Sequence, residues 1–347
     1  MISIQDPRIA PYLTPCRYPQ PVLTGSGVPG AFDEKSVDIP FVFRHGGRFH
    51  MVYTGYDGIG YQSALAVSDD LVHWQHERII LPRLGKDSAR WDRGGGAVTW
   101  MIKESDSLWD VPTLKRVNGR YWGVYHSYPG EGYETGPAQI SLIWCEKEDL
   151  SEWHRLDEPV FSWREGESWE KGGLYKACVI REGGRWLMFY NAKDEAAAWT
   201  EQTGLAFSED LMHWTRYTGN PVLRVTPEAW DRRFVSDPYV AHDGETWLNF
   251  YFGLGPGHAQ EGLALSRDLL HWEKVDAPII GHGAPGSYDS GHAHKASMVY
   301  WQGVLYHFYC ATRPWQPGDP TKVFEEPWAE LRTICVATSK PLEEHDA

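Results

Sequence analysis

The sequence has few features that would indicate export, membrane insertion or disulfide cross-linking. Its 347 residues include only five cysteines, an odd number scattered along the chain, so we expect buried thiols rather than a disulfide framework. No apolar segment follows Met1 and no apolar run is long enough to span a membrane, which predicts a cytoplasmic protein without a membrane partner. The motifs Cys-x-x-Cys and Gly-x-Ser-x-Gly and the phosphate-binding P-loop are also missing, and nothing indicates an organic cofactor.

Positive charge and helical pattern are scarce as well. The 33 Lys and Arg residues face 47 Asp and Glu residues, which gives a formal net charge of −14 that is spread along the chain. This balance argues against binding to nucleic acid or to an anionic membrane surface. Because almost no segment has a helical period, we expect an all-β protein.

A five-fold internal repeat takes the place of these features. Each copy has two strand-like runs joined by a Gly turn and ends in a tyrosine; the copies span 41–53, 113–125, 178–190, 239–251 and 298–309. A second half such as ALAVSDDLVHW (64–74) follows, in which an Asp-Leu turn separates a third strand from a fourth. Five units of four antiparallel strands predict a five-bladed β-propeller.

The repeats leave no room for a linker between domains. We therefore expect one catalytic propeller domain over residues 36–347, preceded by an N-terminal strap or extension over residues 1–35 that is rich in proline. This extension would lie over the ring or contact a second copy, so the protein would be a monomer or a homodimer. The glycine run 94–96 is expected to be a flexible lid before the second blade.

The start of the innermost strand of each blade should point to the propeller axis, where several blades can build one site. Counting back from the turn glycines places Asp38, Asp110, Tyr175, Asp237 and His294 there. Carboxylates gathered at one axis repel and desolvate one another, a cost that proton transfer or a bound cation would justify. The three acids and the histidine are therefore the candidate catalytic set.

An aromatic residue followed by an acid precedes several of these positions. The pairs are Phe32-Asp33, Trp169-Glu170, Trp230-Asp231 and Tyr288-Asp289. Because the pair recurs in blades whose axial residues differ, we interpret it as part of the blade architecture. Glu170 is for that reason a weaker candidate for a catalytic acid than an axial residue.

The repeat number, the blade-starting Asp of the first two repeats and the segment GHAHKASMVYWQGVLYHFY (291–309) resemble the five-bladed glycoside hydrolases of family 43 and their relatives in families 32, 62 and 117. The resemblance implies that Asp38 is the general base and that Asp110 tunes and orients its partner. Family 43 has its general acid Glu at the start of the third blade, where this chain has Tyr175. Family 117 is the better analogue there, since its last blade can supply a histidine acid, and Asp237 and His294 would complete the site.

We therefore expect a glycosidase, exo-acting and inverting, whose partner is an oligosaccharide of plant or algal type. Such enzymes separate their two catalytic groups by about 6.5–9.5 Å to admit a water molecule. His294 is open to a second role, since it could hold a divalent cation such as Ca²⁺ through water. Candidate sugar contacts at the rim are Tyr56, Trp109, His126, Tyr175, Lys176, His292 and Arg313.

Three other functions fit parts of the pattern. A non-catalytic carbohydrate-binding propeller would keep the aromatic residues but would not need the carboxylates together. A glycoside phosphorylase would need several Lys and Arg residues at the axis, where the sequence places only Lys176 and Lys295. A polysaccharide lyase that uses Tyr175 and His294 is more remote.

Overall fold

The structure is a computed structural model that describes residues 1–342. β-strands dominate it, and three short 3₁₀ segments interrupt them: η1 (Ala10–Tyr12), η2 (Trp163–Glu165) and η3 (Ser168–Glu170). The prediction of an all-β protein is confirmed. None of the helical segments in the described part of the chain is long and apolar enough to cross a membrane.

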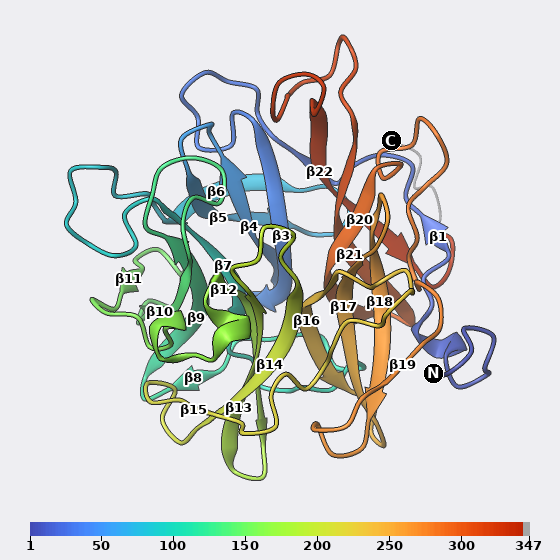
Figure 1. Ribbon diagram of the computed structural model, residues 1–347. Helices are drawn as coiled ribbons and strands as arrows, with labels where there is room; N and C mark the ends of the chain where they lie inside the picture. The colour runs from blue at the N-terminus through green and yellow to red at the C-terminus, as the bar shows by residue number, and fades with distance from the viewer. Residues whose placement is uncertain (343–347) are drawn as a thin grey trace.

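The strands form five antiparallel meanders, numbered here in chain order (Figure 1). Meander 1 contains β3 (Ser36–His45), β4 (Arg48–Tyr56), β5 (Tyr61–Ser68) and β6 (Gln75–Leu81). Meander 2 contains β7 (Gly95–Met101), β8 (Arg116–Val117), β9 (Arg120–Tyr128), β10 (Gln139–Cys145) and β11 (His154–Arg155). Meander 3 contains β12 (Gly173–Glu182), β13 (Arg185–Lys193), β14 (Glu201–Ser208) and β15 (Thr215–Arg216).

Meander 4 contains β16 (Phe234–His242), β17 (Trp247–Leu254), β18 (Ala259–Ser266) and β19 (Glu273–Lys274). Meander 5 contains β20 (His292–Trp301), β21 (Val304–Pro314) and β22 (Glu330–Thr338), to which the N-terminal strands β1 (Cys16–Arg17) and β2 (Leu23–Thr24) are added. Meanders 3 and 4 share one sheet through a parallel pairing of Glu201 with Phe234.

The first strands of the meanders lie together at the middle of the molecule (Figure 1). β3 contacts β7, β7 contacts β12, β12 contacts β16, β16 contacts β20, and β20 contacts β3. The meanders are therefore arranged in a ring, although no sheet within residues 1–342 closes on itself by hydrogen bonding. This arrangement brings the starts of five strands, which are far apart in the sequence, to one place.

Local turn chemistry explains much of the repeat. The hairpin glycines Gly47 and Gly184 have φ angles of 87° and 83°, a region that favours glycine. In the second half of meander 1, Asp70 Oδ1 accepts hydrogen bonds from the backbone N–H groups of Val72 and His73 at 2.9 and 2.8 Å. The same contacts recur at Asp210 and Asp268. The recurring Asp is thus a turn residue.

The closing tyrosines bind the acids of the aromatic-acid pairs. The hydroxyl of Tyr190 donates to Glu170 at 2.9 Å, and those of Tyr251 and Tyr309 donate to Asp231 and Asp289 at 3.0 Å. A cation from the same or a neighbouring segment pairs with each acid: Arg216, Lys274 and Arg17 respectively. Each buried acid therefore ties the entry of its meander to the second strand.

The second meander begins earlier than the repeat predicts. Trp91-Asp92 takes the aromatic-acid position, with Tyr125 donating to Asp92 at 3.0 Å, and the inner strand is β7. Residues 94–96 lead directly into this strand, so the expected flexible lid is wrong. A side chain at Gly94 would collide with the backbone of Gly130, which explains the glycine there. The predicted first strand, 113–117, lies beyond an excursion of the chain and reaches β9 only as β8.

The N-terminal segment holds two meanders from outside. Ile2 forms a bridge with Val275 next to β19, and Tyr12 stacks on Trp109 with ring centroids 6.2 Å apart. β1 and β2 then pair with β22 and complete the outer edge of meander 5. Strands from near the two ends of the chain are thereby joined in one sheet.

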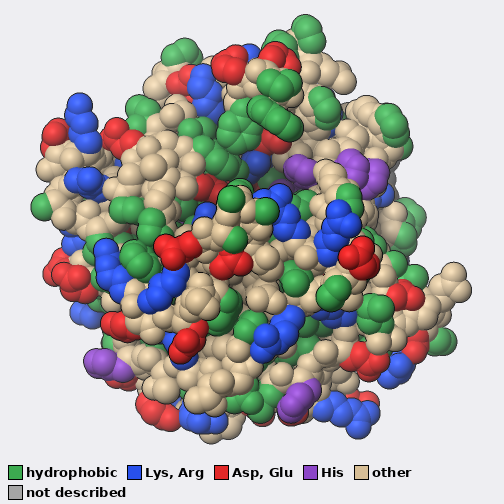
Figure 2. Space-filling model, in the orientation of Figure 1, with side chains coloured by type: hydrophobic (Ala, Val, Ile, Leu, Met, Phe, Trp, Pro, Cys, Tyr) green, Lys and Arg blue, Asp and Glu red, His purple; other side chains and the backbone are tan. Residues whose placement is uncertain are grey.

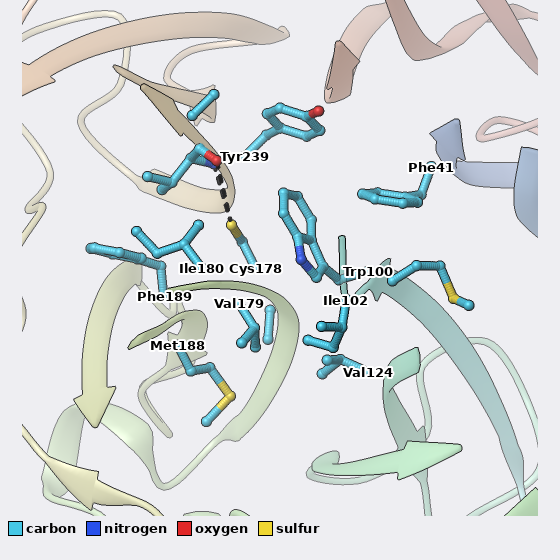
Figure 3. Packing of buried hydrophobic residues seen from close by; sticks show 14 of the residues in the cluster. Phe41, Trp100, Ile102, Val124, Cys178, Val179, Ile180, Met188, Phe189 and Tyr239 are labelled. Atoms are coloured by element: carbon cyan, nitrogen blue, oxygen red, sulfur yellow. Dashed lines mark hydrogen bonds between the residues drawn. The ribbon is translucent and has the colours of Figure 1, made fainter. Parts of the chain in front are cut away.

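Aromatic side chains fill the middle of the ring (Figure 3). The rings of Phe41 and Trp100 are 4.8 Å apart and those of Trp100 and Tyr239 are 5.0 Å apart, so three inner strands meet in one cluster. Cys178 packs beside it and accepts a hydrogen bond from the N–H of Val240 at 3.3 Å (Figure 3). All five cysteines are free, and four of them are buried.

Candidate active site

A cavity of about 400 Å³ lies at the starts of the inner strands. Figure 2 shows histidine, lysine and arginine side chains gathered beside a hollow on this face. Charged and histidine side chains from four meanders and the loop after β9 line the cavity: His126, Glu134, Lys176, Glu201, Arg233, Asp237, His292, His294, Lys295 and Arg332. Aromatic rings line the remainder: Tyr128, Tyr133, Tyr175, Trp199, Phe234 and Phe252.

Irregular strand starts aim these residues into the cavity. The ladder shifts register between Asp38 and Phe41 in β3, and between His294 and Ser297 in β20. Just inside these shifts, Ile39 and Lys295 have φ angles of 51° and 69°, and Asp237 at the matching place in β16 has 51°. Bulges and positive φ angles of this kind re-aim side chains and are frequent at functional sites.

Asp38 lies at the axis, as predicted, but two cations hold it. Lys295 Nζ and Arg332 NH1 donate to Asp38 Oδ2 at 2.6 and 2.9 Å, and the N–H of Ile39 donates to Oδ1 at 2.7 Å. Burial would raise the pKa of Asp38, but the charges of Lys295, Arg332 and His294 outweigh it and hold the pKa well below its usual range. Asp38 is 2% exposed and lies behind the cavity wall rather than on it.

His294 lines the cavity, but its surroundings oppose the expected role as an acid. Burial and the charge of Lys295 lower the pKa of His294 well below its usual range, and only Asp38 acts in the other direction. His294 Nδ1 is 3.2 Å from the carbonyl of Cys310. The expectation that carboxylates raise this pKa is therefore wrong, because the sequence did not reveal the two cations beside it.

The structure separates Asp110 from the other candidates. Asp110 is exposed and accepts a hydrogen bond from Ser105 Oγ at 2.6 Å in the excursion between β7 and β8. Its neighbour Trp109 donates to the carbonyl of Asp243 at 3.1 Å and packs on Tyr12, away from the cavity. The axial place in meander 2 belongs to Ala97, which pairs with His126. Neither predicted residue can contribute there.

Asp237 and Glu201 form a coupled pair of carboxylates. Asn191 Nδ2 donates to Glu201 Oε2 at 3.0 Å and to Asp237 Oδ1 at 3.2 Å, while Trp199 Nε1 donates to Glu201 Oε1 at 3.1 Å. Burial and the charge of Asp237 raise the pKa of Glu201 to about 7. Burial also raises the pKa of Asp237, partly offset by Lys176. Glu201 can therefore carry a proton at neutral pH, which a general acid requires.

The predicted sugar contacts divide into two groups. His126, Tyr175, Lys176 and His292 line the cavity. Lys176 Nζ is buried and donates to the carbonyls of Asp237 and Ala296 at 3.3 and 3.4 Å, so it joins the starts of two inner strands.

Tyr56 and Arg313 do not line the cavity. Tyr56 packs behind the wall, with its ring 5.5 Å from that of Tyr133. Arg313 pairs with Asp319 at 2.6 Å. Glu170, bound to Tyr190 and Arg216, is likewise inside its meander and not on the cavity wall.

Sequence reasoning missed Glu134, Asn191, Glu201 and Arg332. Asn191 directly follows a closing tyrosine, as His126 does, so the repeat held a signal for it. Glu201 opens the third strand of its meander, Arg332 lies in the last strand, and Glu134 lies in the loop between β9 and β10. These three positions have no counterpart in the repeat, and only the folded chain brings them to the axis.

The donors around Asp38 suit ammonium and guanidinium groups better than a metal. Lys295 and Arg332 already balance its charge, and no group of three or more His, Cys, Asp or Glu side chains within residues 1–342 is arranged to hold a metal ion. We therefore assign no chemical step to a cation, and the predicted Ca²⁺ remains a prediction.

Comparison with known proteins places this site in a family. Residues 108–284, just over half of the chain, match the family model "Glycosyl hydrolases family 32 N-terminal domain". The chain belongs to this family. The predicted kinship with the propeller glycoside hydrolases, among which family 32 was named, is thus confirmed, as is the prediction of a glycosidase at the level of the family.

Three similar proteins extend the comparison for this family 32 chain. A solved structure described as a BT0996 complex with RGII is 29% identical, with a TM-score of 0.77 over 95% of this chain and 93% of that one. Fructan 1-exohydrolase w3 of Triticum aestivum is 25% identical over 48% of this chain and 29% of its own length. Beta-1,2-mannobiose phosphorylase of Thermoanaerobacter sp. (strain X514) is 26% identical over 38% of this chain and 51% of its own. The chain spans about half or less of these two curated relatives.

Proposed function

We propose that this chain is an exo-acting glycoside hydrolase that removes a terminal sugar from a plant-type oligosaccharide. We infer that its ring of five meanders is a five-bladed β-propeller with the site at one end of the axis. The observation that carries the proposal is Glu201, a cavity-lining carboxyl group with its pKa near 7, bound to Asn191 and Trp199. Glycoside hydrolysis needs such a proton donor for the leaving oxygen.

The blind shape of the cavity supports action at a chain end. The aromatic cluster of Phe41, Trp100 and Tyr239 occupies the ring beneath it, so a saccharide can enter from one side only. The fructan exohydrolase and the RGII complex among the similar proteins make plant saccharides the first substrates to test.

Glu134 is the best candidate for the second carboxylate of the reaction. It lines the cavity, it is exposed, and no side chain within residues 1–342 donates a hydrogen bond to it, so a water molecule or an anomeric carbon can approach it. Asp38 is a weaker base than we predicted, because Lys295 and Arg332 bind it and lower its pKa. In this account Asp38 holds the two cations in place, and Asp237 tunes Glu201.

A phosphorylase is the second candidate. Lys176, Arg233, Lys295 and Arg332 line the cavity, which is a larger basic group than the sequence revealed. Arg233 has no carboxylate partner within residues 1–342 and lies over the Trp199 ring, 4.7 Å from its centroid. An inorganic phosphate ion could bind there, and the similarity to a mannobiose phosphorylase favours testing for it.

The test is a screen of the purified protein on fructans, RGII oligosaccharides, plant arabino-oligosaccharides and β-1,2-mannobiose, with and without phosphate. Hydrolysis without phosphate, with release of single sugars from the ends of the saccharide, is the expected result. Product NMR gives the anomer, and inversion would mean that a water molecule fits between the two carboxylates. Turnover that requires phosphate would instead identify a phosphorylase, and turnover of none of these saccharides would contradict the proposal.

A further inference from the structure

Asn191 is a buried polar residue whose amide faces two ways. It is 3% exposed and lies in β13, directly after Tyr190, whose hydroxyl is bound to Glu170. Its Nδ2 donates to Glu201 Oε2 at 3.0 Å and to Asp237 Oδ1 at 3.2 Å. Both N–H bonds of the amide are thereby used. The reverse orientation would set a carbonyl oxygen against two carboxylates, so the hydrogen bonds fix which atom points where.

The other end of the amide has no partner. Asn191 Oδ1 is buried and accepts no hydrogen bond within residues 1–342, while the residue lines the cavity. Native proteins rarely leave a buried carbonyl oxygen unpaired, because its desolvation costs free energy that no interaction returns. An acceptor presented to a sugar-sized cavity beside a proton donor is suited to a hydroxyl group of the ligand.

We propose that Asn191 is both a positioning residue for Glu201 and the acceptor for a hydroxyl group of the sugar whose glycosidic bond is cleaved. The amino group holds Glu201 and Asp237 at a fixed separation. The carbonyl group then places the sugar relative to that pair. This inference rests on the proposed function, since it assigns Glu201 as the proton donor.

The charges around Glu201 define what the loss of Asn191 should do. Asp237 from β16 and Glu134 from the loop after β9 disfavour the ionised form of Glu201, while the Asn191 amide favours it. Arg233 lies nearby over the Trp199 ring. Removal of the amide therefore leaves Glu201 protonated to a higher pH, and the alkaline limb of the pH–rate profile should move upward.

Two variants at this position separate the two roles. Asn191→Ala removes donor and acceptor, whereas Asn191→Asp keeps an acceptor oxygen, loses the donor and adds a negative charge. Both should shift the alkaline limb upward, Asn191→Asp the more. Asn191→Ala should also reduce kcat/KM about 5–10-fold on the parent substrate, the value of one neutral hydrogen bond. The reduction should vanish on the deoxy analogue that lacks the hydroxyl bound by Oδ1, found by comparing a series of deoxy substrates.

Asn249→Ala is the matched control. Asn249 is another fully buried asparagine, in β17, and it does not line the cavity. It should leave the pH profile and the deoxy pattern unchanged. An Asn191→Ala profile identical to that of the wild type, or an equal shift in Asn249→Ala, would overturn the inference.

Sugar binding without turnover distinguishes this failure from a failure of the proposed function. In calorimetry with the released sugar, Asn191→Ala should bind about 5–10-fold more weakly than Glu201→Gln, which keeps the amide of Asn191. Equal binding would refute the acceptor role even if Glu201 is the acid. Full activity of Glu201→Gln would refute the proposed function instead, whatever the binding result.

Discussion

At the scale of single residues, the neighbours of a carboxyl group decide whether it can move a proton. Asp38 and Glu201 are both close to the axis, yet Lys295 and Arg332 keep one ionised while burial beside Asp237 keeps the other protonated near neutral pH. A catalytic acid needs a pKa near the working pH, so the second environment is the useful one. Asp38 then serves the site by fixing two cations that line the cavity.

The substitution Asp38→Asn tests this role. It leaves Lys295 and Arg332 buried without their charge partner, so we expect a loss of about 3–5 kcal/mol in the free energy of unfolding together with reduced turnover. Chemical denaturation gives the first quantity and steady-state kinetics the second. A variant that is as stable as the wild type but has lost more than about 100-fold in turnover would restore Asp38 as the general base.

The residues at the axis were only partly accessible from the sequence. The repeat correctly placed Asp38, Tyr175 and His294 at strand starts, with Asp237 one position further along, because strand phase carries that information. Their chemical roles depend on Arg332 and Glu201, which come from strands outside the repeated positions. A count of strand residues cannot show which cation will meet which acid.

At the scale of the element, the aromatic-acid pair and the closing tyrosine form the lock of each meander. In meander 3, Glu170 Oε1 accepts hydrogen bonds from the Tyr190 hydroxyl and from Arg216 Nε, both at 2.9 Å, and Oε2 accepts from the N–H of Glu167 at 2.8 Å. Glu170 is 1% exposed. These contacts satisfy both carboxylate oxygens, which leaves none for a substrate.

Glu170→Gln should therefore reduce stability and spare catalysis. Loss of the charge leaves Arg216 without its partner, and we expect a loss of about 1–3 kcal/mol in the free energy of unfolding with turnover within about two-fold of the wild type. The exposed neighbour Glu165 provides the control variant Glu165→Gln, which should change neither quantity. A strong dependence of Glu170→Gln on the leaving group would return this residue to the role of catalytic acid.

Sequence reasoning was reliable for elements wherever the repeat kept its spacing. The turn glycines and the Asp-Leu turns were predicted because each has a local cause in φ angles or side-chain hydrogen bonds. Meander 2 was misplaced because the chain makes an excursion between β7 and β8, which moved the visible motif away from the inner strand. Trp91-Asp92 was the signal that would have corrected it.

At the scale of the whole molecule, the ring buries ionisable groups beneath its site. Glu261 in β18 and His307 in β21 are fully buried, and neither side chain has a hydrogen-bond partner within residues 1–342. Burial raises the pKa of Glu261 well above its usual range, with Lys176 acting in the opposite direction. The folded chain must therefore take up a proton at Glu261 when it folds at neutral pH.

Glu261→Gln should stabilise the protein at neutral pH. An unfolded Glu titrates near about 4.3, so the wild type loses stability at this residue as the pH rises above that value towards the raised pKa of the folded state. The advantage of the variant should shrink as the pH falls to about 4, where both states are protonated. Melting temperatures of wild type, Glu261→Gln and the exposed control Glu209→Gln across this range test it. An advantage that grows on acidification would contradict the assignment.

The central claim is that Glu201 donates the proton to the leaving group. The most direct measurement compares Glu201→Gln with His294→Gln on substrates whose leaving groups differ in acidity. Glu201→Gln should lose about 10²–10⁴-fold in turnover on an oligosaccharide and much less on an activated aryl glycoside, which needs little protonation. His294→Gln should show no such dependence. If the leaving-group dependence follows His294 instead, or if Glu201→Gln cleaves both substrates at the wild-type rate, the account is wrong.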